Sequence, residues 1–439
     1  MRFPIKRVNR IIQLMDTKDF ITICQGTNPK NFTRTRKMPP KKLTLTILTR
    51  KGTTLSTELR RQTKLYPKDD PISKPGYLKQ RQKLNPQALQ TLIDHQNQDL
   101  YKNHKPDLKT YKGYLILADD GTNLNLPTTK ETLKQYGNST NHGTKPQAAL
   151  GLSCRYDILN KTILHLTINR VKFNEIAQTQ IHHQKTPTTV DNIPTIITLD
   201  RAYPSLALFV PWIASDQKFV IRLKSHDFKD ERSQMQTNDQ QLTIALTPPR
   251  LVRHKKNPIY PLLEQTKTVM LRVVNVARPD GSTVSVVTNL DESFSATEIA
   301  EVYRLRWEVE TAFDMLKNQL EVENFTGTKP VLIVQDVLAC VFLFNLAQDM
   351  IYDAQVLYDA QKKVSKHRMV VNRGFAIGVL KDELVGVLLE TNGVRKRERF
   401  LAMIEMLKMQ VLPVRPDRSF VRNKGNFAGK YCNTRKRCY

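Results

Sequence analysis

The chain has 439 residues, 40% of them hydrophobic, which is ordinary for a soluble globular protein and enough for two or three domains. It carries 69 lysines and arginines against 41 acidic residues, a formal net charge of +28. Its five cysteines are scattered and odd in number, which excludes a disulfide framework and a zinc site of regular spacing.

The positive charge gathers at the two ends of the sequence. Residues 1–112 hold 25 basic and 8 acidic side chains, and residues 413–439 hold 8 basic and 1 acidic. A near-neutral centre between basic ends indicates nucleic-acid-binding extensions on a folded core. A membrane surface is another anionic partner, but no long basic amphipathic helix, lipidation signal or apolar leader is evident. We therefore expect no membrane partner and a cytoplasmic protein that is nucleoid-associated when bound to DNA.

Residues 1–108 are expected to form short helices joined by basic loops. The segment K-Q-R-Q-K-L-N-P-Q-A-L-Q contains a helix start, with Asn85 as the cap and Pro86 as the first helical residue. These pieces are too polar to be the main core. The range is therefore interpreted as a basic helical DNA-binding domain.

Apolar runs predict a sheet in residues 109–204, the first part of a core. They lie at 114–120, 148–158, 162–168 and 194–200, with a short polar helix or loop at 172–190. The last run, P-T-I-I-T-L-D, is continuously apolar and β-branched, which suits a strand buried on both faces. Two hairpin-like strands beside a buried strand predict a mixed sheet. The pair His182-His183 lies in the polar segment and is expected to be exposed.

Residues 205–295 are expected to form an all-β insertion. They contain the alternating runs F-V-I-R-L-K, L-T-I-A-L-T and V-M-L-R-V-V-N-V-A, and Asp280-Gly281 is a hairpin turn signal. The pattern becomes helical from residue 296. Residues 296–365 are interpreted as the second part of the core, and residues 366–439 as a helical region with a basic tail.

The longest apolar run, at 331–347, is interrupted by polar residues. Gln335, Asp336 and Asn345 fall within it, so it predicts a buried helix rather than a membrane span.

Three acids stand at positions where chemistry is possible. Asp120 ends the first strand, Asp200 ends the buried strand, and Glu310 lies in the later helix. Three such carboxylates suit Mg²⁺, and two such ions can activate an attacking oxygen and stabilise a leaving one. An aspartate at a strand end is more often a turn former, and Asp119 competes with Asp120, because alternation along a strand does not choose between them.

The stretch Y-R-L-R-W-E-V-E-T-A-F-D-M-L-K, at 303–317, places four polar side chains on one helical face. At about 100° per residue, Tyr303, Arg306, Glu310 and Lys317 fall within a stripe about 60° wide. The stripe is either a solvated, salt-bridged surface, since Arg306 and Glu310 form an i,i+4 pair, or a metal ligand flanked by phosphate-binding groups.

Together these residues resemble the signature regions of the DDE transposases of bacterial insertion sequences. The matching segments are D-G-T at 120–122, L-D-R-A-Y at 199–203 and Y-x2-R-x3-E-x6-K at 303–317. The last spacing is similar to that of the branch called insertion sequence four, with its Tyr-Arg-Glu-Lys signature. The resemblance covers about residues 30–350 and includes the β insertion.

The resemblance implies an α/β fold: a ribonuclease-H-like mixed sheet flanked by helices, interrupted by the insertion and preceded by the basic helical domain. It implies two Mg²⁺ ions, for which Mn²⁺ can substitute, and it selects Asp120 over Asp119. The residue roles follow by position: metal binding and catalysis by Asp120, Asp200 and Glu310, and DNA phosphate binding by Tyr303, Arg306 and Lys317.

The implied function is cut-and-paste transposition. The enzyme would bind the terminal inverted repeats, hydrolyse the phosphodiester at the element ends and join the 3′-OH to target DNA, as a homodimer on paired ends of double-stranded DNA. Members of the branch use a tryptophan in the insertion at a hairpin intermediate, whereas this chain has only Trp212 and Trp307, with Tyr260 as a possible substitute. The alternatives are a ribonuclease-H-like DNA nuclease without strand transfer and an inactive, domesticated DNA-binding protein.

Overall fold

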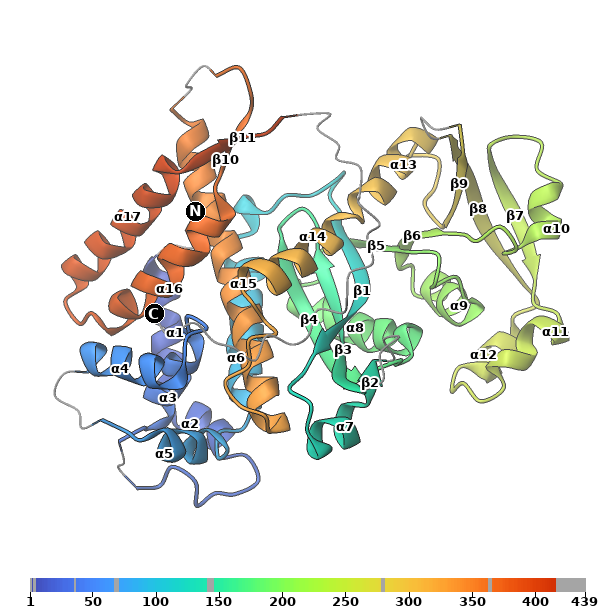
Figure 1. Ribbon diagram of the computed structural model, residues 1–439. Coiled ribbons are helices and arrows are strands. Elements are labelled where there is room, and N and C mark those ends of the chain that lie inside the picture. The colour runs from blue at the N-terminus through green and yellow to red at the C-terminus, as the bar shows by residue number, and fades with distance from the viewer. Residues whose placement is uncertain are drawn as a thin grey trace.

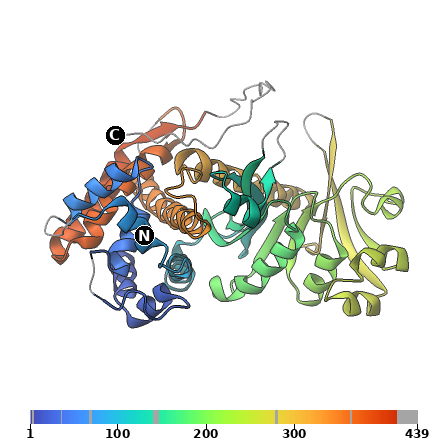
Figure 2. The ribbon, with the colours of Figure 1, turned by 60° about the horizontal axis from the view of Figure 1, so that its bottom comes forward.

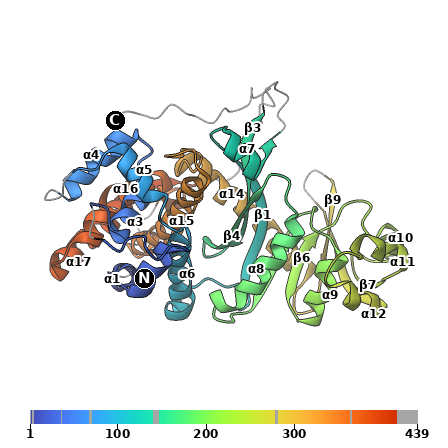
Figure 3. The ribbon, with the colours of Figure 1, turned by 90° about the horizontal axis from the view of Figure 1, so that it is seen from below.

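The computed structural model describes residues 2, 5–34, 37–66, 71–139, 146–277, 281–361 and 365–415. Helices from the two ends of the chain lie side by side at one end of the molecule, and the last strands of the sheet lie at the other end (Figure 1). Two further views show the same arrangement, with the first strands of the large sheet between the terminal helices and the last strands (Figures 2 and 3).

The first 108 residues are helical, as the sequence predicts. The elements are α1 Ile5–Met15, α2 Lys18–Gln25, α3 Pro40–Leu48, α4 Leu55–Leu65, α5 Lys74–Arg81, α6 Gln87–Asn103 and the 3₁₀ turn η1 Lys105–Asp107. Helix α6 begins at Gln87, one residue later than expected, and Pro86 rather than Asn85 occupies its N-cap position. The Asn85 side-chain oxygen still accepts a hydrogen bond from the Gln87 amide (3.2 Å).

A nine-stranded mixed sheet forms the centre of the described part of the chain. Its first elements are β1 Leu115–Asn125, α7 Lys130–Tyr136, β2 Asn138–Ser139, β3 Gln147–Asp157, β4 Thr162–Arg170, α8 Glu175–Thr189 and β5 Thr195–Leu199. Strand β1 is antiparallel to β3 and parallel to β5, and β3 is antiparallel to β4. With β6 parallel to β5, the order β4-β3-β1-β5-β6 is that of a ribonuclease-H-like sheet, which confirms the predicted fold class.

Helices cover both faces of this sheet. Alternate residues of β1 point to opposite faces: Leu115 and Leu117 join one buried apolar cluster, whereas Ile116 and Ala118 join another, larger one. Helix α8 packs on β1, β3 and β4, while α14 Glu308–Asp314 packs on β1 and α15 Pro330–Asp359 packs on β4. Strands β1 and β4 therefore lie between helices that come from distant parts of the sequence.

The insertion at 205–295 is not all-β, so that expectation is wrong. It contains β6 Lys218–Arg222, β7 Asp239–Ala245, β8 Thr268–Ala277 and β9 Thr283–Thr288, together with α9 Leu206–Ala214, α10 Lys229–Ser233, α11 Pro248–Leu251, η2 Val252–His254 and α12 Tyr260–Gln265. Helix α9 forms because its apolar side chains are buried all round, among them Phe209 and Trp212, and pack in a second apolar cluster beneath the strands. Asp280 of the expected turn lies outside the described residues, and Gly281 has φ 78°.

Strands of the insertion also continue the main sheet. Strand β9 pairs with both β6 and β8, and β7 pairs with β8. The domain boundaries expected from the sequence remain predictions, since hydrogen bonds run from β1 to β7 through a single sheet.

The second half of the core is helical. Its elements are α13 Ala296–Leu305, α14, the π-helical turn Met315–Gln319, α15, β10 Met369–Val371, α16 Arg373–Leu389, α17 Gly393–Met409 and β11 Val411–Pro413. Helix α15 is long and apolar enough to cross a membrane, but 89% of its most apolar window is buried inside the protein. The prediction of a buried helix at 331–347 is thus confirmed.

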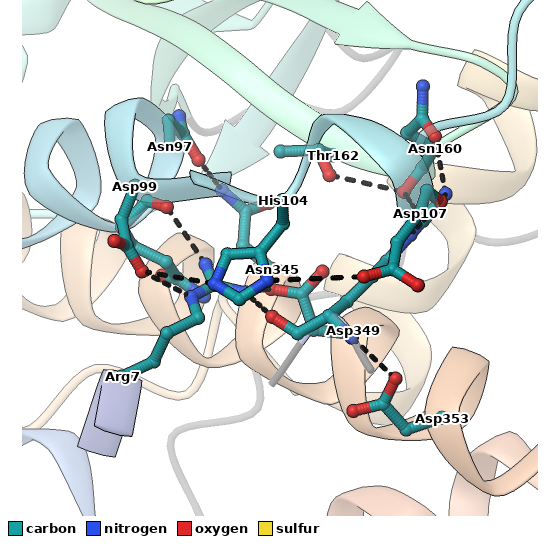
Figure 4. A network of polar contacts seen from close by, with 12 residues as sticks. Arg7, Asn97, Asp99, His104, Asp107, Asn160, Thr162, Asn345, Asp349 and Asp353 are labelled. Carbon is teal, nitrogen blue, oxygen red and sulfur yellow. Dashed lines mark hydrogen bonds and ion pairs between the residues drawn. The ribbon is translucent and has the colours of Figure 1, made fainter. Parts of the chain in front are cut away.

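Buried polar contacts fasten the N-terminal helices to α15 and the sheet (Figure 4). Arg7 of α1 forms ion pairs with Asp99 of α6 (2.8 Å) and Asp349 of α15 (2.9 Å). Arg81 of α5 pairs in the same way with Asp336 of α15 (2.8 Å). Part of the positive charge of residues 1–112 is therefore paired with buried acids and is not available to bind a DNA backbone.

Candidate active site

Asp120 and Asp200 lie at equivalent positions on neighbouring strands. In the parallel β1–β5 pair, Ala118 is the partner of Thr198. Continuing this register by two residues places Asp120 opposite Asp200, which follows the last residue of β5 directly. Two carboxylates 80 residues apart in sequence thus come together in the interior of the sheet, one in the middle of β1 and one directly after β5.

Asp119 points to the opposite face and is fully engaged there. Its two oxygens accept bonds from Nε and Nη2 of Arg155, each at 2.7 Å, and its side chain is buried with that of Arg155. Such a bidentate pair satisfies the carboxylate completely. The geometry therefore leaves Asp120 as the carboxylate on the other face, the choice that the motif D-G-T implies. The expectation that Asp120 ends its strand is wrong, because β1 continues beyond it to Asn125.

Glu310 faces Asp120 from helix α14, across the guanidinium of Arg306. Arg306 Nη2 donates to Glu310 Oε1 at 2.8 Å, and Arg306 Nη1 lies 3.8 Å from Asp120 Oδ2. The Arg306 side chain is only 12% exposed, whereas that of Glu310 is 37% exposed. The expected i,i+4 pair is present, and it is part of the acidic cluster rather than an isolated surface pair.

The helix that carries the stripe is not regular. Helix α13 ends at Leu305, and the amides of Arg306 and Trp307 bond to carbonyls three residues back, which tightens the turn before α14. A wide π-helical turn follows at Met315–Gln319. The single helix expected at 303–317 is therefore divided into a tight turn, the regular helix α14 and a wide π-helical turn. π-Helical turns occur often at functional sites.

Lys317 comes from that wide turn and reaches the site from the far side. Its ammonium donates to Thr122 Oγ1 at 2.6 Å, and Thr122 is two residues beyond Asp120 on the same face of β1. Tyr303, at the other end of the stripe, is half-buried beside Arg306. Burial raises the pKa of the Tyr303 phenol, and the Arg306 charge opposes that rise. All four stripe residues therefore lie along the Asp120 face of the sheet.

The Asp120 carboxyl has a perturbed acidity. Burial raises its pKa to about 6, and the charges of Asp200 and Glu175 add to this rise. The Gly121 amide, which donates to Asp120 Oδ1 at 2.8 Å, and the Arg306 charge act in the opposite direction. A perturbed carboxyl with like-charged neighbours is typical of a functional site.

The donor chemistry of this cluster fits a hard divalent cation. Asp120, Asp200 and Glu310 offer only carboxylate oxygens, the ligands that Mg²⁺ prefers, and a guanidinium already bridges two of them. Within the described ranges, no three acidic, histidine or cysteine side chains are close enough to hold one ion together. Glu310 must therefore release Arg306 before it can bind a cation with Asp120.

A cavity of about 530 Å³ adjoins the cluster, between α13 and strands β8 and β9. Tyr303, Arg306 and Trp307 form one wall, and Val284 and Val286 line it with apolar side chains. The Trp307 side chain is 53% exposed there.

The other aromatic residues considered from the sequence are engaged elsewhere. Trp212 is 2% exposed and packs against His183 and Phe219. Tyr260 donates to Glu264 on α12 and packs against the second apolar cluster. Of the two tryptophans, Trp307 is the one beside the acids.

The expectation of an exposed histidine pair is wrong. His182 is fully buried beneath the sheet, where its Nε2 lies 3.1 Å from Ser153 Oγ, and burial lowers its pKa to about 4. His183 is half-buried. Both lie on α8, whose inner side covers the sheet, so they belong to the core.

Sequence reasoning missed two residues at the cluster. Glu175, the first residue of α8, raises the pKa of Asp120, and Tyr203, the last residue of L-D-R-A-Y, lowers the pKa of Glu175. Tyr203 stood inside a quoted motif and could have been found. Glu175 follows a strand by five residues, and that position alone gave no signal.

A family model described as "Transposase DDE domain" matches residues 111–346, and the chain belongs to this family. The matched range contains all six residues singled out from the sequence.

The chain is similar to two curated proteins. The "Transposase InsG for insertion sequence element IS4" of Escherichia coli (strain K12) is 23% identical over 294 residues, which cover 65% of this chain and 62% of that protein. The "Putative transposase y4zB" of Sinorhizobium fredii (strain NBRC 101917 / NGR234) is 31% identical over 78 residues, 18% of this chain and 22% of that protein. A solved piggyBac transposase synaptic complex with hairpin DNA is similar at a TM-score of 0.45 and 11% identity, over 90% of this chain and 85% of that one.

Proposed function

We propose that this chain is the transposase of an insertion sequence of the branch with the Tyr-Arg-Glu-Lys signature. It binds the terminal inverted repeats, cleaves the phosphodiester at the element ends and joins the freed 3′-OH to target DNA. One observation carries the proposal: the parallel register of β1 and β5, continued by two residues, brings Asp120 beside Asp200, and the Arg306 guanidinium lies between Asp120 and Glu310.

The basic groups of the stripe would hold the DNA. The planar fork of Arg306 suits bidentate binding of a phosphate, and an incoming phosphate would compete with Glu310 for it. Lys317, in its place beside Thr122, would contact a second phosphate on the same strand. Phosphate binding thus frees Glu310 at the moment when the scissile bond arrives.

The acids would hold the metal. Asp120, Asp200 and Glu310 would bind two Mg²⁺ ions, for which Mn²⁺ can substitute, and these would activate the attacking oxygen and stabilise the leaving oxygen. In end cleavage, a water oxygen bonds to phosphorus and the 3′ oxygen leaves as a hydroxyl. In joining, that hydroxyl attacks a target phosphodiester, and a target 3′-OH leaves.

The exposed basic residues of the N-terminal helices would recognise the element ends. Lys74, Lys79 and Lys83 are exposed on and after α5, in contrast to the buried Arg7 and Arg81. Both ends must be cut together, so we propose a homodimer on paired ends, which a mass measurement of the complex with two end duplexes would test.

The test compares Glu310→Gln with Glu308→Gln on a duplex that carries the inverted repeat flanking the coding region. Glu308 lies on the same helix but pairs with Lys161 (2.5 Å). Glu310→Gln should abolish end cleavage and keep end binding, while Glu308→Gln should cleave as the parent does. Full cleavage by Glu310→Gln would refute the assignment.

Product analysis of the same reactions separates the related functions. Strand-transfer products with the parent chain support a transposase. Cleavage without joining supports a nuclease, and end binding with no cleavage by the parent chain supports an inactive DNA-binding protein.

A further inference from the structure

We propose that Glu175 is a fourth carboxylate of the metal site, which holds one of the two divalent ions from the α8 side of the sheet. The inference rests on the proposed function and extends it to a residue outside the three signature regions. Glu175 enters the cluster from the face of β1 opposite to that of Glu310.

The Glu175 carboxylate lies directly over the backbone at Gly121. A Cβ placed on Gly121 would stand 2.9 Å from Glu175 Oε1 and 3.0 Å from Phe173 Cζ. A side chain at position 121 would therefore have to push this carboxylate away from β1. In the motif D-G-T, Asp120 thus supplies one carboxylate and Gly121 leaves space for the carboxylate of Glu175.

The surroundings of Glu175 are negative. Asp120 and Asp200 lie close enough to Glu175 for their charges to act on one another, and the Tyr203 phenol lies beside it. The carboxylates of Asp120, Asp200 and Glu175 repel one another, and a bound divalent ion would reduce this repulsion.

Tyr203 provides an independent indication of a missing ligand. Tyr203 is only 1% exposed. Its hydroxyl lies close enough to the Glu175 carboxylate to lower the pKa of that group, but it makes no hydrogen bond of ordinary distance and angle. Glu175, Asp120, Asp119 and Asp200 all raise the pKa of this phenol, after burial as the larger cause. A buried hydroxyl without a partner is rare, and here it lies among carboxylates where a metal-bound water would satisfy it.

Helix capping is the alternative explanation of Glu175. An acid in the first turn of a helix is favoured by the helix dipole, and Asn174 caps α8. Glu131 is a matched control, because it lies in the first turn of α7 and is exposed. A capping role predicts the same behaviour for Glu175→Gln and Glu131→Gln.

The experiment measures Mn²⁺ binding to the full chain with an end duplex, by electron paramagnetic resonance, for the parent, Glu175→Gln and Glu131→Gln. The Mn²⁺ concentration for half-maximal cleavage is measured on the same samples. We expect Glu175→Gln to raise both concentrations by about 10- to 100-fold and Glu131→Gln to match the parent. Equal values for all three would overturn the inference.

A second variant guards against a folding defect. Gly121→Ala keeps all the carboxylates but its Cβ displaces that of Glu175, so it should raise the same two concentrations. If Glu175→Gln fails to fold and Gly121→Ala binds Mn²⁺ as the parent does, the inference is wrong. A parent chain that neither binds Mn²⁺ nor cleaves would instead contradict the proposed function.

Discussion

Replacing Asp120 by asparagine should stabilise the metal-free protein. The fold holds this carboxyl at a pKa of about 6, compared with 3.8 for the free group. One pKa unit corresponds to about 1.4 kcal/mol, so ionising Asp120 in the folded state costs about 3 kcal/mol relative to the unfolded chain. The asparagine oxygen can still accept the Gly121 amide, and it carries no charge.

The sign of the effect fixes its pH dependence. Well below pH 3.8 the carboxyl is protonated in both the folded and the unfolded state, so variant and parent should unfold alike there. The stability that protonated Asp120 provides is lost as the pH rises through about 6. The advantage of Asp120→Asn should therefore grow between pH 4 and 6 and remain constant above.

The assay is urea unfolding with a chelator present, followed by circular dichroism from pH 4 to 7.5. Asp119→Asn is the control, because it leaves Arg155 buried without its partner and should destabilise by about 3–5 kcal/mol. A pH-independent difference between Asp120→Asn and the parent would refute the reasoning. So would destabilisation by Asp120→Asn at pH 7.

Further substitutions test the DNA-binding groups. Lys79→Gln with Lys83→Gln should lower end affinity and reduce the salt dependence by about 0.9 for each lysine–phosphate pair removed, measured by fluorescence anisotropy; an unchanged slope would place the binding surface elsewhere. Arg306→Lys keeps the charge but not the planar fork, so end binding should weaken and end cleavage should slow at least about tenfold, and parental cleavage rates would contradict this role. Trp307→Ala should weaken binding of an end with unpaired bases by about 1–3 kcal/mol, but not binding of a fully paired end, and equal losses would exclude base stacking.

Local patterns predicted the strands that carry the acids. The β-branched run before Asp200 could only be a buried strand, and the mixed sheet followed from its neighbours. The choice between Asp119 and Asp120 was beyond local reasoning, because it depends on Arg155, which lies 36 residues away in sequence and directly opposite Asp119 on the neighbouring strand β3.

Other features depend on tertiary packing. Helix α9 lies in a region that was expected to be all-β. Its apolar side chains fill the space beneath the insertion strands, and no hydrophobic periodicity in the sequence indicates this packing. The tight and wide turns around Glu310 are individually unfavourable, and the contacts of Arg306 and Lys317 hold them. The position of the Glu175 carboxylate beside Gly121 is set by tertiary packing, and no local sequence pattern indicates it.

The ion pairs of Arg7 and Arg81 with α15 have a consequence for the cutting position. They tie the N-terminal helices to α15 of the catalytic core. Under the proposed function, this fixed arrangement would set the number of base pairs between the sequence that the N-terminal helices recognise and the cut. A chimera that exchanges only residues 1–108 with a relative would strand acids such as Asp336 and Asp349 without counterions, unless the facing side of α15 is exchanged with them.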